Sequence, residues 1–265
     1  MNGLLLYNEQ DAANNIWFTD KLIRTGKRYG MDIALALTDS SEGFNGINFI
    51  INRTRDFNIG KRFEDRGIYC FNNSKTTEIG NDKWKTYLLC KELGLPVMNT
   101  VLYGDNESAD SFCFPCVMKS TDGHGGNEVF MVNSPAAAAD IAKKYPEKSF
   151  ILQEPSSDLG IDVRVYTVGR SALCGVLRKS RSDFRSNFSL GGSAEPFDIT
   201  ARQREAASVL MQSLNTDYVG IDFIKHRGEW VINEIEDAAG ARMLYSLGEI
   251  DICENFVQHI ADKTL

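Results

Sequence analysis

A cluster of acidic residues follows a strand-like run near the end of the sequence, in EWVINEIEDAAGARML (residues 229–244). Glu234, Glu236 and Asp237 lie within four positions of one another. Carboxylates this close raise one another's pKa and repel unless a cation lies between them. A metal ion, an arginine partner and solvent are the three candidates, and this segment alone does not choose among them.

The acidic cluster belongs to a predicted β-hairpin, because strand-like segments 218–224 and 229–235 flank the turn KHRG. Alternation places Glu234 and Glu236 on one face of their strand, and Asp222 shares that face if it pairs with or near Glu234. Mg²⁺ is commonly held by one or two carboxylates together with substrate phosphates. A solvated acidic edge that faces arginine or lysine fits the hairpin about equally well.

Basic residues are concentrated in RVYTVGRSALCGVLRKSRSDFRSNF (residues 164–188), although the chain carries a net charge of −7. Arg178 ends a predicted strand and Arg185 lies in the loop after it. From these positions guanidinium groups could clamp phosphate oxygens. We expect Arg170 and Arg181 to belong to a solvated basic face.

A third feature joins Lys119 to the loop DGHGG (residues 122–126). A lysine at a strand end beside a glycine hairpin, whose backbone amides can fold over phosphates, predicts a phosphate-binding loop. The loop differs from a Walker-A loop, which joins a strand to a helix and ends in Gly-Lys-Ser/Thr, because here the lysine precedes the glycines. His124 lies in this loop, where we expect surface exposure and not catalysis.

These motifs, in this order, resemble the ATP-grasp fold and specifically the RimK-like amino-acid ligases. The likeness covers most of residues 65–245. Its most specific parts are DFRSNFSLGGSA and VGIDF…NEIEDAAG. Supporting matches are NDKWKT with Lys83, VMKSTDGHGG with Lys119, LQEP with Glu154, and GIDVRV with Asp162 and Arg164.

The resemblance implies ATP bound between two α+β sub-domains, with two Mg²⁺ ions or with Mn²⁺ in their place. The residues implied in nucleotide binding are Lys83, Lys119, Gly123, Gly125, Gly126, Glu154, Pro155, Ser157, Asp162 and Ser186. The two lysines would contact the phosphates, Glu154 and the backbone after it would form the adenine hinge, and Asp162 would hold the ribose.

The same resemblance implies the remaining site residues. Those implied are Arg178, Arg185 and Asn187 for catalysis, Asp222, Glu234 and Glu236 for the metals, and Arg164, Gly191 and Gly192 for substrate. Two positions depart from the family pattern, where Asn usually stands at position 236 and Pro at position 239. Glu236 adds a negative charge to the metal site, which puts the number of metal ions or their affinity in question. Ala239 in place of Pro does not change which residues are expected to bind the metals and phosphates.

The function implied by the resemblance is ATP-dependent ligation of a carboxylate to an amine through an acyl phosphate. By analogy, an amino acid such as glutamate would be added to a small molecule, peptide or protein. Ligation to a thiol or hydroxyl shares every motif, and a non-catalytic nucleotide-binding protein is the alternative from another class. Arg53, in INRTRD, is a candidate for holding a substrate carboxylate, with a surface salt bridge as the equal alternative.

These residues require a chain of mixed α/β and α+β structure to position them. The strands we expect are 3–7, 32–37, 46–51, 67–72, 114–120, 127–132, 149–153, 162–168, 171–178, 218–224 and 229–235, and the helices are 11–30, 81–96, 134–145 and one that begins at a Thr200–Gln203 capping box. The predicted organisation is a small N-terminal α/β domain (1–78) before an ATP-grasp domain (79–265) with sub-domains of about 97–150 and 151–265.

Composition restricts the partners further. A net charge of −7 argues against binding of nucleic acid or an anionic membrane, and no run approaches the roughly 18 apolar residues of a membrane span. We therefore expect a cytoplasmic protein that acts on small-molecule or peptide carboxylates and amines, with self-association left open. Its six cysteines are predicted to be reduced. CFPC (113–116) is expected in the core and not at a zinc or redox site.

Overall fold

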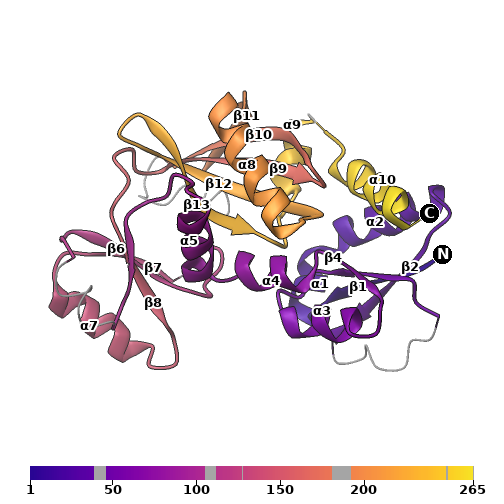
Figure 1. Cartoon of the computed structure of the whole chain (residues 1–265), viewed down its shortest axis with the longest axis horizontal. Coiled ribbons are helices and arrows are strands. Elements are labelled where there is room, and N and C mark those ends of the chain that lie inside the picture. Colours follow the sequence, from indigo (N-terminus) through magenta and orange to yellow (C-terminus); the bar gives the residue numbers. More distant parts are fainter. Residues whose placement is uncertain (39–45, 105–111, 127, 181–191, 249, 265) are drawn as a thin grey trace.

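The chain folds around three β-sheets in a computed structural model that describes all residues except 39–45, 105–111, 127, 181–191, 249 and 265. The sheet of β1–β4 and the sheet of β5–β8 form two lobes, and the larger sheet of β9–β13 lies above and between them in the view of Figure 1. Mixed α/β and α+β structure is therefore confirmed.

The N-terminal sheet is parallel, with the strand order β2-β1-β3-β4. Its elements are β1 (Asn2–Tyr7), β2 (Asp32–Leu37), β3 (Phe49–Asn52) and β4 (Tyr69–Phe71), with helices α1 (Glu9–Asn14), α2 (Ile16–Arg28), α3 (Phe57–Glu64) and α4 (Ser74–Gly80). The apolar run of β1 is continuous because a parallel strand is buried on both faces. Leu4 and Leu6 pack into one hydrophobic cluster, whereas Leu5 and Tyr7 pack into another on the opposite face.

The middle sheet is antiparallel, with the order β5-β8-β6-β7. Its elements are β5 (Thr100–Leu102), β6 (Cys116–Ser120), β7 (Val129–Val132), helix α7 (Pro135–Lys144) and β8 (Phe150–Gln153). The glycine loop connects β6 to β7, so its predicted place inside a hairpin is confirmed. Because β8 pairs with β5 and β6, the middle sheet extends to Gln153.

The large sheet is antiparallel and has the order β11-β10-β9-β12-β13. Its strands are β9 (Ile161–Val168), β10 (Ser171–Lys179), β11 (Ser193–Phe197), β12 (Tyr218–His226) and β13 (Glu229–Glu236), and the helices around it are α5 (Lys83–Glu92), α8 (Ala201–Leu214), α9 (Arg242–Leu247) and α10 (Ile252–Thr264). Helix α8 starts at the predicted capping box of Thr200 and Gln203. Side chains of α5 and α8 form one hydrophobic cluster with this sheet.

Several predicted elements differ from the observed ones. Residues 11–30 form two helices with a break at Asn15, whose φ of −121° and ψ of 24° are not helical. Helices α3, α4, α9 and α10 were not predicted. Strand β11 was not among the expected strands. All six cysteines are free, but Cys113 is exposed, so only Cys116 of the CFPC pair lies in the core as expected.

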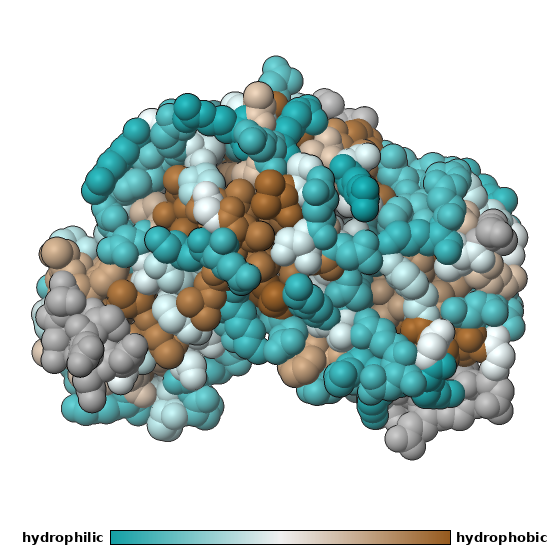
Figure 2. Space-filling model, in the orientation of Figure 1, coloured by the Kyte–Doolittle hydropathy of each residue, from teal (hydrophilic) through white to brown (hydrophobic). Residues whose placement is uncertain are grey.

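The surface is largely hydrophilic on the face shown in Figure 2, and hydrophobic side chains gather near its middle, where α5 and α8 lie in Figure 1. None of the described helices is both long enough and apolar enough to cross a membrane. Helix α10 packs against α2, which brings the last helix of the chain onto the N-terminal sheet.

Candidate active site

The three predicted metal-binding carboxylates converge at the β12–β13 hairpin. Asp222 pairs directly with Glu234 in the register of the two strands, and Glu236 lies two residues further along β13. Each residue offers an oxygen atom, and these oxygens all lie within 4.8 Å of one another. A group of carboxylate oxygens at this spacing fits a hard cation such as Mg²⁺. The convergence expected from strand alternation is therefore confirmed.

Two arginines from the neighbouring strands contact this carboxylate group. Arg164 on β9 donates from Nε and Nη2 to the two oxygens of Asp222, both at 2.7 Å, and its Nη2 also contacts Glu236. Arg178 on β10 donates from Nη2 to Asp222 at 2.6 Å. Burial alone would raise the pKa of Asp222, but the two guanidinium groups hold it below its usual value. The added charge of Glu236 is thus compensated by Arg164.

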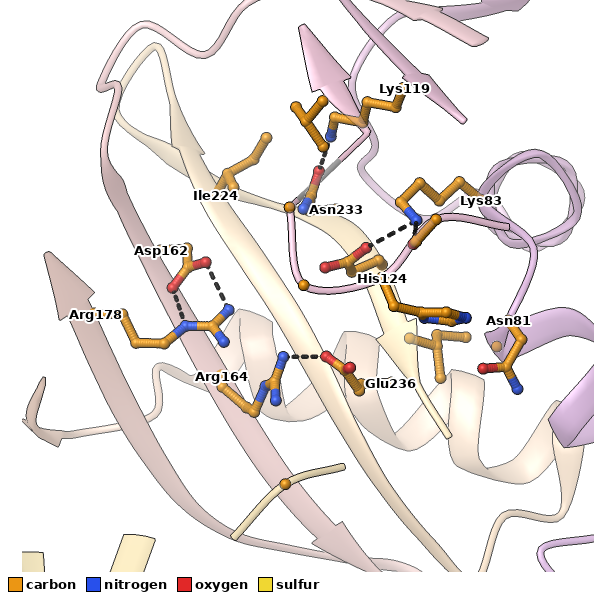
Figure 3. A pocket seen from close by; sticks show the side chains of 18 of the residues that line it. Asn81, Lys83, Lys119, His124, Asp162, Arg164, Arg178, Ile224, Asn233 and Glu236 are labelled. Carbon is orange, nitrogen blue, oxygen red and sulfur yellow. Dashed lines mark hydrogen bonds and ion pairs between the residues drawn. The ribbon is translucent and has the colours of Figure 1, made fainter. Parts of the chain in front are cut away.

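Arg178 is held in place by Asp162. Its Nε and Nη2 donate to the two oxygens of Asp162 at 2.5 and 2.6 Å, and both side chains are almost fully buried. Figure 3 shows this pair beside the Arg164–Glu236 contact. Both oxygens of Asp162 accept hydrogen bonds from Arg178, so Asp162 orients this arginine. Ribose binding by Asp162 stays a prediction.

Two lysines from outside the large sheet approach β13, which carries two of the carboxylates (Figure 3). Lys119 on β6 donates from Nζ to Gln153 Oε1 at 2.7 Å and to Asn233 Oδ1 at 2.9 Å. Burial lowers the pKa of Lys119 to about 8, and the nearby Glu234 opposes this shift while Lys83 adds to it. Lys83, at the first position of α5, contacts the carbonyl oxygen of Gly123 and lies 3.7 Å from Glu234.

Of the three carboxylates, Glu234 is the one that, among the described residues, lies near a lysine and pairs with no arginine. Burial raises its pKa, and the nearby Lys83 opposes that shift. Lys83 therefore links the glycine loop, through the Gly123 carbonyl, to the carboxylate group. This link places the loop over the same cleft.

The glycine loop between β6 and β7 needs its glycines. Gly125 and Gly126 have φ values of 67° and 78°, which side chains rarely adopt. A Cβ atom on Gly123 would lie 2.1 Å from the hydroxyl oxygen of Ser120. His124 is exposed, as expected, and it lines the cleft.

The predicted adenine hinge follows β8. The backbone N–H of Glu154 donates to the carbonyl oxygen of Asn99 at 2.9 Å, and its carboxylate accepts from Arg227 at 2.7 Å. Glu154 lines the cleft, but the Ser157 hydroxyl turns away and accepts from the backbone N–H of Arg227 at 2.7 Å. Among the described residues of this segment, Ser156 lines the cleft, and Pro155 and Ser157 do not.

Arg53 is buried, with 5% of its surface exposed, so the surface salt bridge considered as an alternative is wrong. Its guanidinium lies 5.1 Å from the ring centre of Phe18 and 5.5 Å from that of Tyr218. Nη2 donates to the carbonyl oxygens of Ala239 and Ala238 at 2.9 and 3.2 Å. Arg53 thereby connects the N-terminal sheet to the segment after β13, and it lines the cleft.

Four of the predicted site residues lie outside the described part of the chain. They are Arg185, Ser186, Asn187 and Gly191. Gly192 immediately precedes β11 and does not line the cleft. Arg170 is exposed, as expected, and Arg181 lies outside the described residues.

Other residues line the cleft that sequence reasoning did not identify, notably Gln153, Asn233, Asp11 and Arg55. Asn233 is the extra residue of a β-bulge, because Asp222 pairs with Glu234 while Phe223 pairs with Ile232. A bulge turns a side chain away from simple alternation, so the period of the strand could not reveal it. The cleft encloses about 910 Å³, which is enough for a nucleotide and a small second ligand.

Comparison with known proteins agrees with this geometry. A family model described as a RimK-like ATP-grasp domain matches residues 80–260. A probable alpha-L-glutamate ligase of Haemophilus influenzae is 24% identical over 208 residues, which cover 76% of this chain and 69% of that protein. An uncharacterized protein of Mycoplasma genitalium, MG011, is 27% identical over 272 residues, which cover 98% and 93% of the two chains.

Solved structures share the fold at low sequence identity. D-alanine–D-alanine ligase from Bacillus anthracis, complexed with ATP, superimposes with a TM-score of 0.79 at 14% identity. The alignment covers 100% of this chain and 97% of that ligase chain. The ATP-grasp ligase PsnB, complexed with a minimal precursor, Mg and ADP, has a TM-score of 0.72 at 15% identity. The alignment covers 99% of this chain and 98% of the PsnB chain. The expected ATP-grasp fold is confirmed.

Proposed function

This chain belongs to the RimK-like ATP-grasp family, and from that premise we propose that it joins a carboxylate to an amine through an acyl phosphate formed with ATP. ADP and phosphate would be the other products. The chain is an enzyme of the carboxylate–amine ligase class. The observation that carries the proposal is the convergence of Asp222, Glu234 and Glu236 opposite Lys83 and Lys119 across one cleft.

Nucleotide and metal would be held by residues on opposite walls of the cleft. Asp222, Glu234 and Glu236 fit Mg²⁺, which, bound with ATP, would neutralise charge on the phosphates. Lys83 and Lys119 offer ammonium groups to the same phosphates, and the backbone amides of the glycine loop can cover them. The proposal includes two Mg²⁺ ions, for which Mn²⁺ can substitute.

The two buried arginines supply fixed positive charge where the phosphoryl group would move. Arg164 and Arg178 are oriented by Asp222, Glu236 and Asp162, so little reorganisation is needed when charge develops. Phosphoryl transfer depends mainly on positioning and charge neutralisation, which explains a site built from lysines, arginines and carboxylates. Arg185 and Asn187, beyond the described residues, are proposed to assist them.

An amino acid is the proposed amine substrate, with glutamate the first candidate because of the name of the Haemophilus influenzae relative. The other partner would be a carboxylate on a small molecule, peptide or protein. PsnB has been solved in complex with a precursor peptide, which supports a peptide among these possibilities. A thiol or hydroxyl acceptor would use the same nucleotide site and is distinguished by the product bond.

A screen of carboxylate and amine pairs by phosphate release tests the proposal. With MgATP, release should require both partners, and mass spectrometry should find a product joined by an amide bond. Glu234→Gln, which alters a proposed metal ligand, provides the inactive control. Phosphate release that needs no carboxylate, or a product that is a thioester or an ester, would contradict the proposed reaction.

A further inference from the structure

A lysine outside the cleft contacts both ends of the glycine loop. Lys148 lies in the turn between α7 and β8 and does not line the cleft. Its Nζ donates to Oδ1 and Oδ2 of Asp122 at 3.0 and 3.1 Å, and it lies 3.5 Å from Oε2 of Glu128. Asp122 precedes the glycines of the loop and Glu128 follows them. One ammonium group therefore holds the two ends of the loop together.

Glu128 is held against the loop by Ser120. The Ser120 hydroxyl donates to Glu128 Oε2, and the backbone N–H of Ser120 donates to the carbonyl oxygen of Glu128 at 3.1 Å. A Cβ atom on Gly123 would lie 2.1 Å from Ser120 Oγ and 2.8 Å from Glu128 Oε2. The Ser120–Glu128 pair thus lies directly against Gly123 and limits where the loop backbone can lie.

The other side of the loop contacts Lys83. The carbonyl oxygen of Gly123 accepts from Nζ of Lys83, which lies 3.7 Å from Glu234. The backbone N–H of Lys83 also donates to the carbonyl oxygen of Thr121 at 2.8 Å. A continuous series of contacts therefore runs from Lys148, through the glycine loop, to a proposed phosphate ligand and a proposed metal ligand.

The charges of Asp122 and Glu128 are unexpected beside a proposed phosphate site, because carboxylates repel a polyanion. Their pairing with Lys148 gives them a structural use. The hydrogen bond to Asp122 raises the pKa of Lys148, so its ammonium group stays protonated at neutral pH. The Lys148 side chain is 24% exposed, so these ion pairs are partly withdrawn from the solvent that weakens fully exposed ones.

We propose that Lys148 is a positioning residue that fixes the glycine loop in its phosphate-binding place by holding Asp122 and Glu128 together. Ordering a loop costs conformational entropy, and a loop that is already held does not take that cost from the binding free energy of the nucleotide. This inference rests on the proposed function, because it takes the loop to cover the phosphates of ATP.

Hydrogen exchange tests the contact without any ligand. In the nucleotide-free protein, backbone amides of the glycine loop should exchange several-fold faster in Lys148→Met than in wild type, because methionine keeps the length of the side chain and removes the charge. Lys148→Arg, which keeps the charge, should exchange at nearly the wild-type rate. Equal exchange in wild type and Lys148→Met would overturn the proposal.

Calorimetric titration with a non-hydrolysable ATP analogue and Mg²⁺ measures the effect on the nucleotide. Lys148→Met should lower the affinity by about two- to five-fold, which is the effect of one partly exposed ion pair, and Lys148→Arg should restore most of it. Lys21→Met is the matched control, because Lys21 lies 2.7 Å from Asp251, is 31% exposed and does not line the cleft. It should leave the affinity unchanged.

Asp122→Asn separates positioning from a simple effect of charge. Removal of a negative charge near a polyanion should by itself strengthen nucleotide binding, whereas loss of the Lys148 contact should weaken it. We expect binding weaker by about two- to five-fold, and a double variant with Lys148→Met that binds no more weakly than either single variant. Stronger binding by Asp122→Asn, or additive losses in the double variant, would overturn the proposal.

This inference and the proposed function fail in different ways. If wild type binds no ATP analogue, the proposed function is contradicted and the inference falls with it. If wild type and Lys148→Met bind the analogue equally tightly, the inference alone is overturned and the proposed nucleotide site stands.

Discussion

We expect Lys119 to make nucleotide affinity dependent on pH. Burial lowers its pKa to about 8, and phosphates bound beside it would raise that pKa again, so binding takes up a proton above pH 8. ATP affinity should be highest below pH 8, where Lys119 is protonated. It should fall as the pH rises above 8, by at most about ten-fold per pH unit. Calorimetric titration with a non-hydrolysable analogue between pH 7 and 9.5 measures this dependence.

The matched variant is Lys119→Met, which keeps most of the side-chain volume and removes the charge. It should bind the analogue weakly at every pH and lose the dependence above pH 8. Wild-type affinity that stays constant up to pH 9.5 would show that Lys119 does not contact the phosphates.

Arg178 supports the fold as well as the proposed reaction. It contacts Asp162 and Asp222, both almost fully buried, so Arg178→Ala removes a charged partner from each of these carboxylates. We expect unfolding free energy to fall by about 3–5 kcal/mol and turnover to fall more than ATP affinity. Thermal unfolding and steady-state kinetics check both effects. Arg178→Lys should retain part of each, and an unchanged melting temperature for Arg178→Ala would contradict the ion pairs.

Glu234 and Glu236 should differ in importance. Glu236→Asn removes one contact of Arg164, which still holds Asp222 through two hydrogen bonds, and it introduces the residue usual in the family. Substantial activity should remain. Glu234→Gln removes the carboxylate that faces Lys83 and should abolish activity. Turnover against Mg²⁺ concentration compares the variants; an inactive Glu236→Asn beside an active Glu234→Gln would reverse the two assignments.

At the scale of elements, the alternation of β13 was enough to predict which carboxylates converge. The pairing of Asp222 with Glu234 follows from a tight turn and a period of two. The same rule could not predict that Asn233 contacts Lys119, because the bulge adds a residue that alternation does not count. The contacts of Arg164 and Arg178 with Asp222 could not be predicted either, because they depend on the strand order β10-β9-β12, which no local sequence pattern contains.

The glycine loop provides a prediction at this scale. Gly125→Ala places a side chain on a residue with φ of 67°, at a cost of about 1–2 kcal/mol, and should displace the loop and lower ATP affinity several-fold. Gly67→Ala is the control, because Gly67 has φ of 76° in the turn before β4 and nothing within 4 Å of its added Cβ. Both variants should lose similar stability in urea unfolding; equal ATP affinities would contradict the loop's role.

At the scale of the whole molecule, Asn72 joins the N-terminal sheet to the large sheet. Its Nδ2 donates to Tyr218 O and Asp237 Oδ1, both at 2.7 Å, and its Oδ1 accepts from the backbone N–H groups of Asp217 and Tyr218 at 2.7 and 2.8 Å. Asp237 directly follows Glu236, one of the proposed metal ligands. Asn72 therefore supports the position of the proposed metal site, and it does not itself line the cleft.

Asn72→Ala should lower the free energy of unfolding by roughly 3 kcal/mol or more, since each buried group left without a partner costs about 1–3 kcal/mol. Turnover should also fall at temperatures where the variant stays folded. Urea unfolding and steady-state kinetics measure the two effects. Asn58→Ala, at an exposed side chain that bonds only within its own turn, should change neither. Stability equal to wild type would contradict the connecting role of Asn72.

Long-range packing is the part of this fold that the sequence could not predict. The hydrophobic spacing of a helix shows which face is buried and not what covers it. Helix α10 packs on α2, and Phe256 lies against Phe71 and Tyr218, with ring centres 6.3 and 5.3 Å apart. Arg53 was recognised as a candidate for the cleft, but its contacts with the carbonyls of Ala238 and Ala239 depend on this packing.

The return of α10 to the N-terminal sheet has a consequence for synthesis on the ribosome. Strands β1–β4 emerge first, yet Phe71 and its neighbours are covered by residues of α10, which follow some 180 positions later. At a translation rate of about 5–20 residues per second, the part of that face that α10 covers stays open for roughly 10–40 s, although Phe18 and Leu22 of α2 already pack into the same cluster. Apolar side chains of the nascent N-terminal sheet therefore stay incompletely covered until α10 has been synthesised.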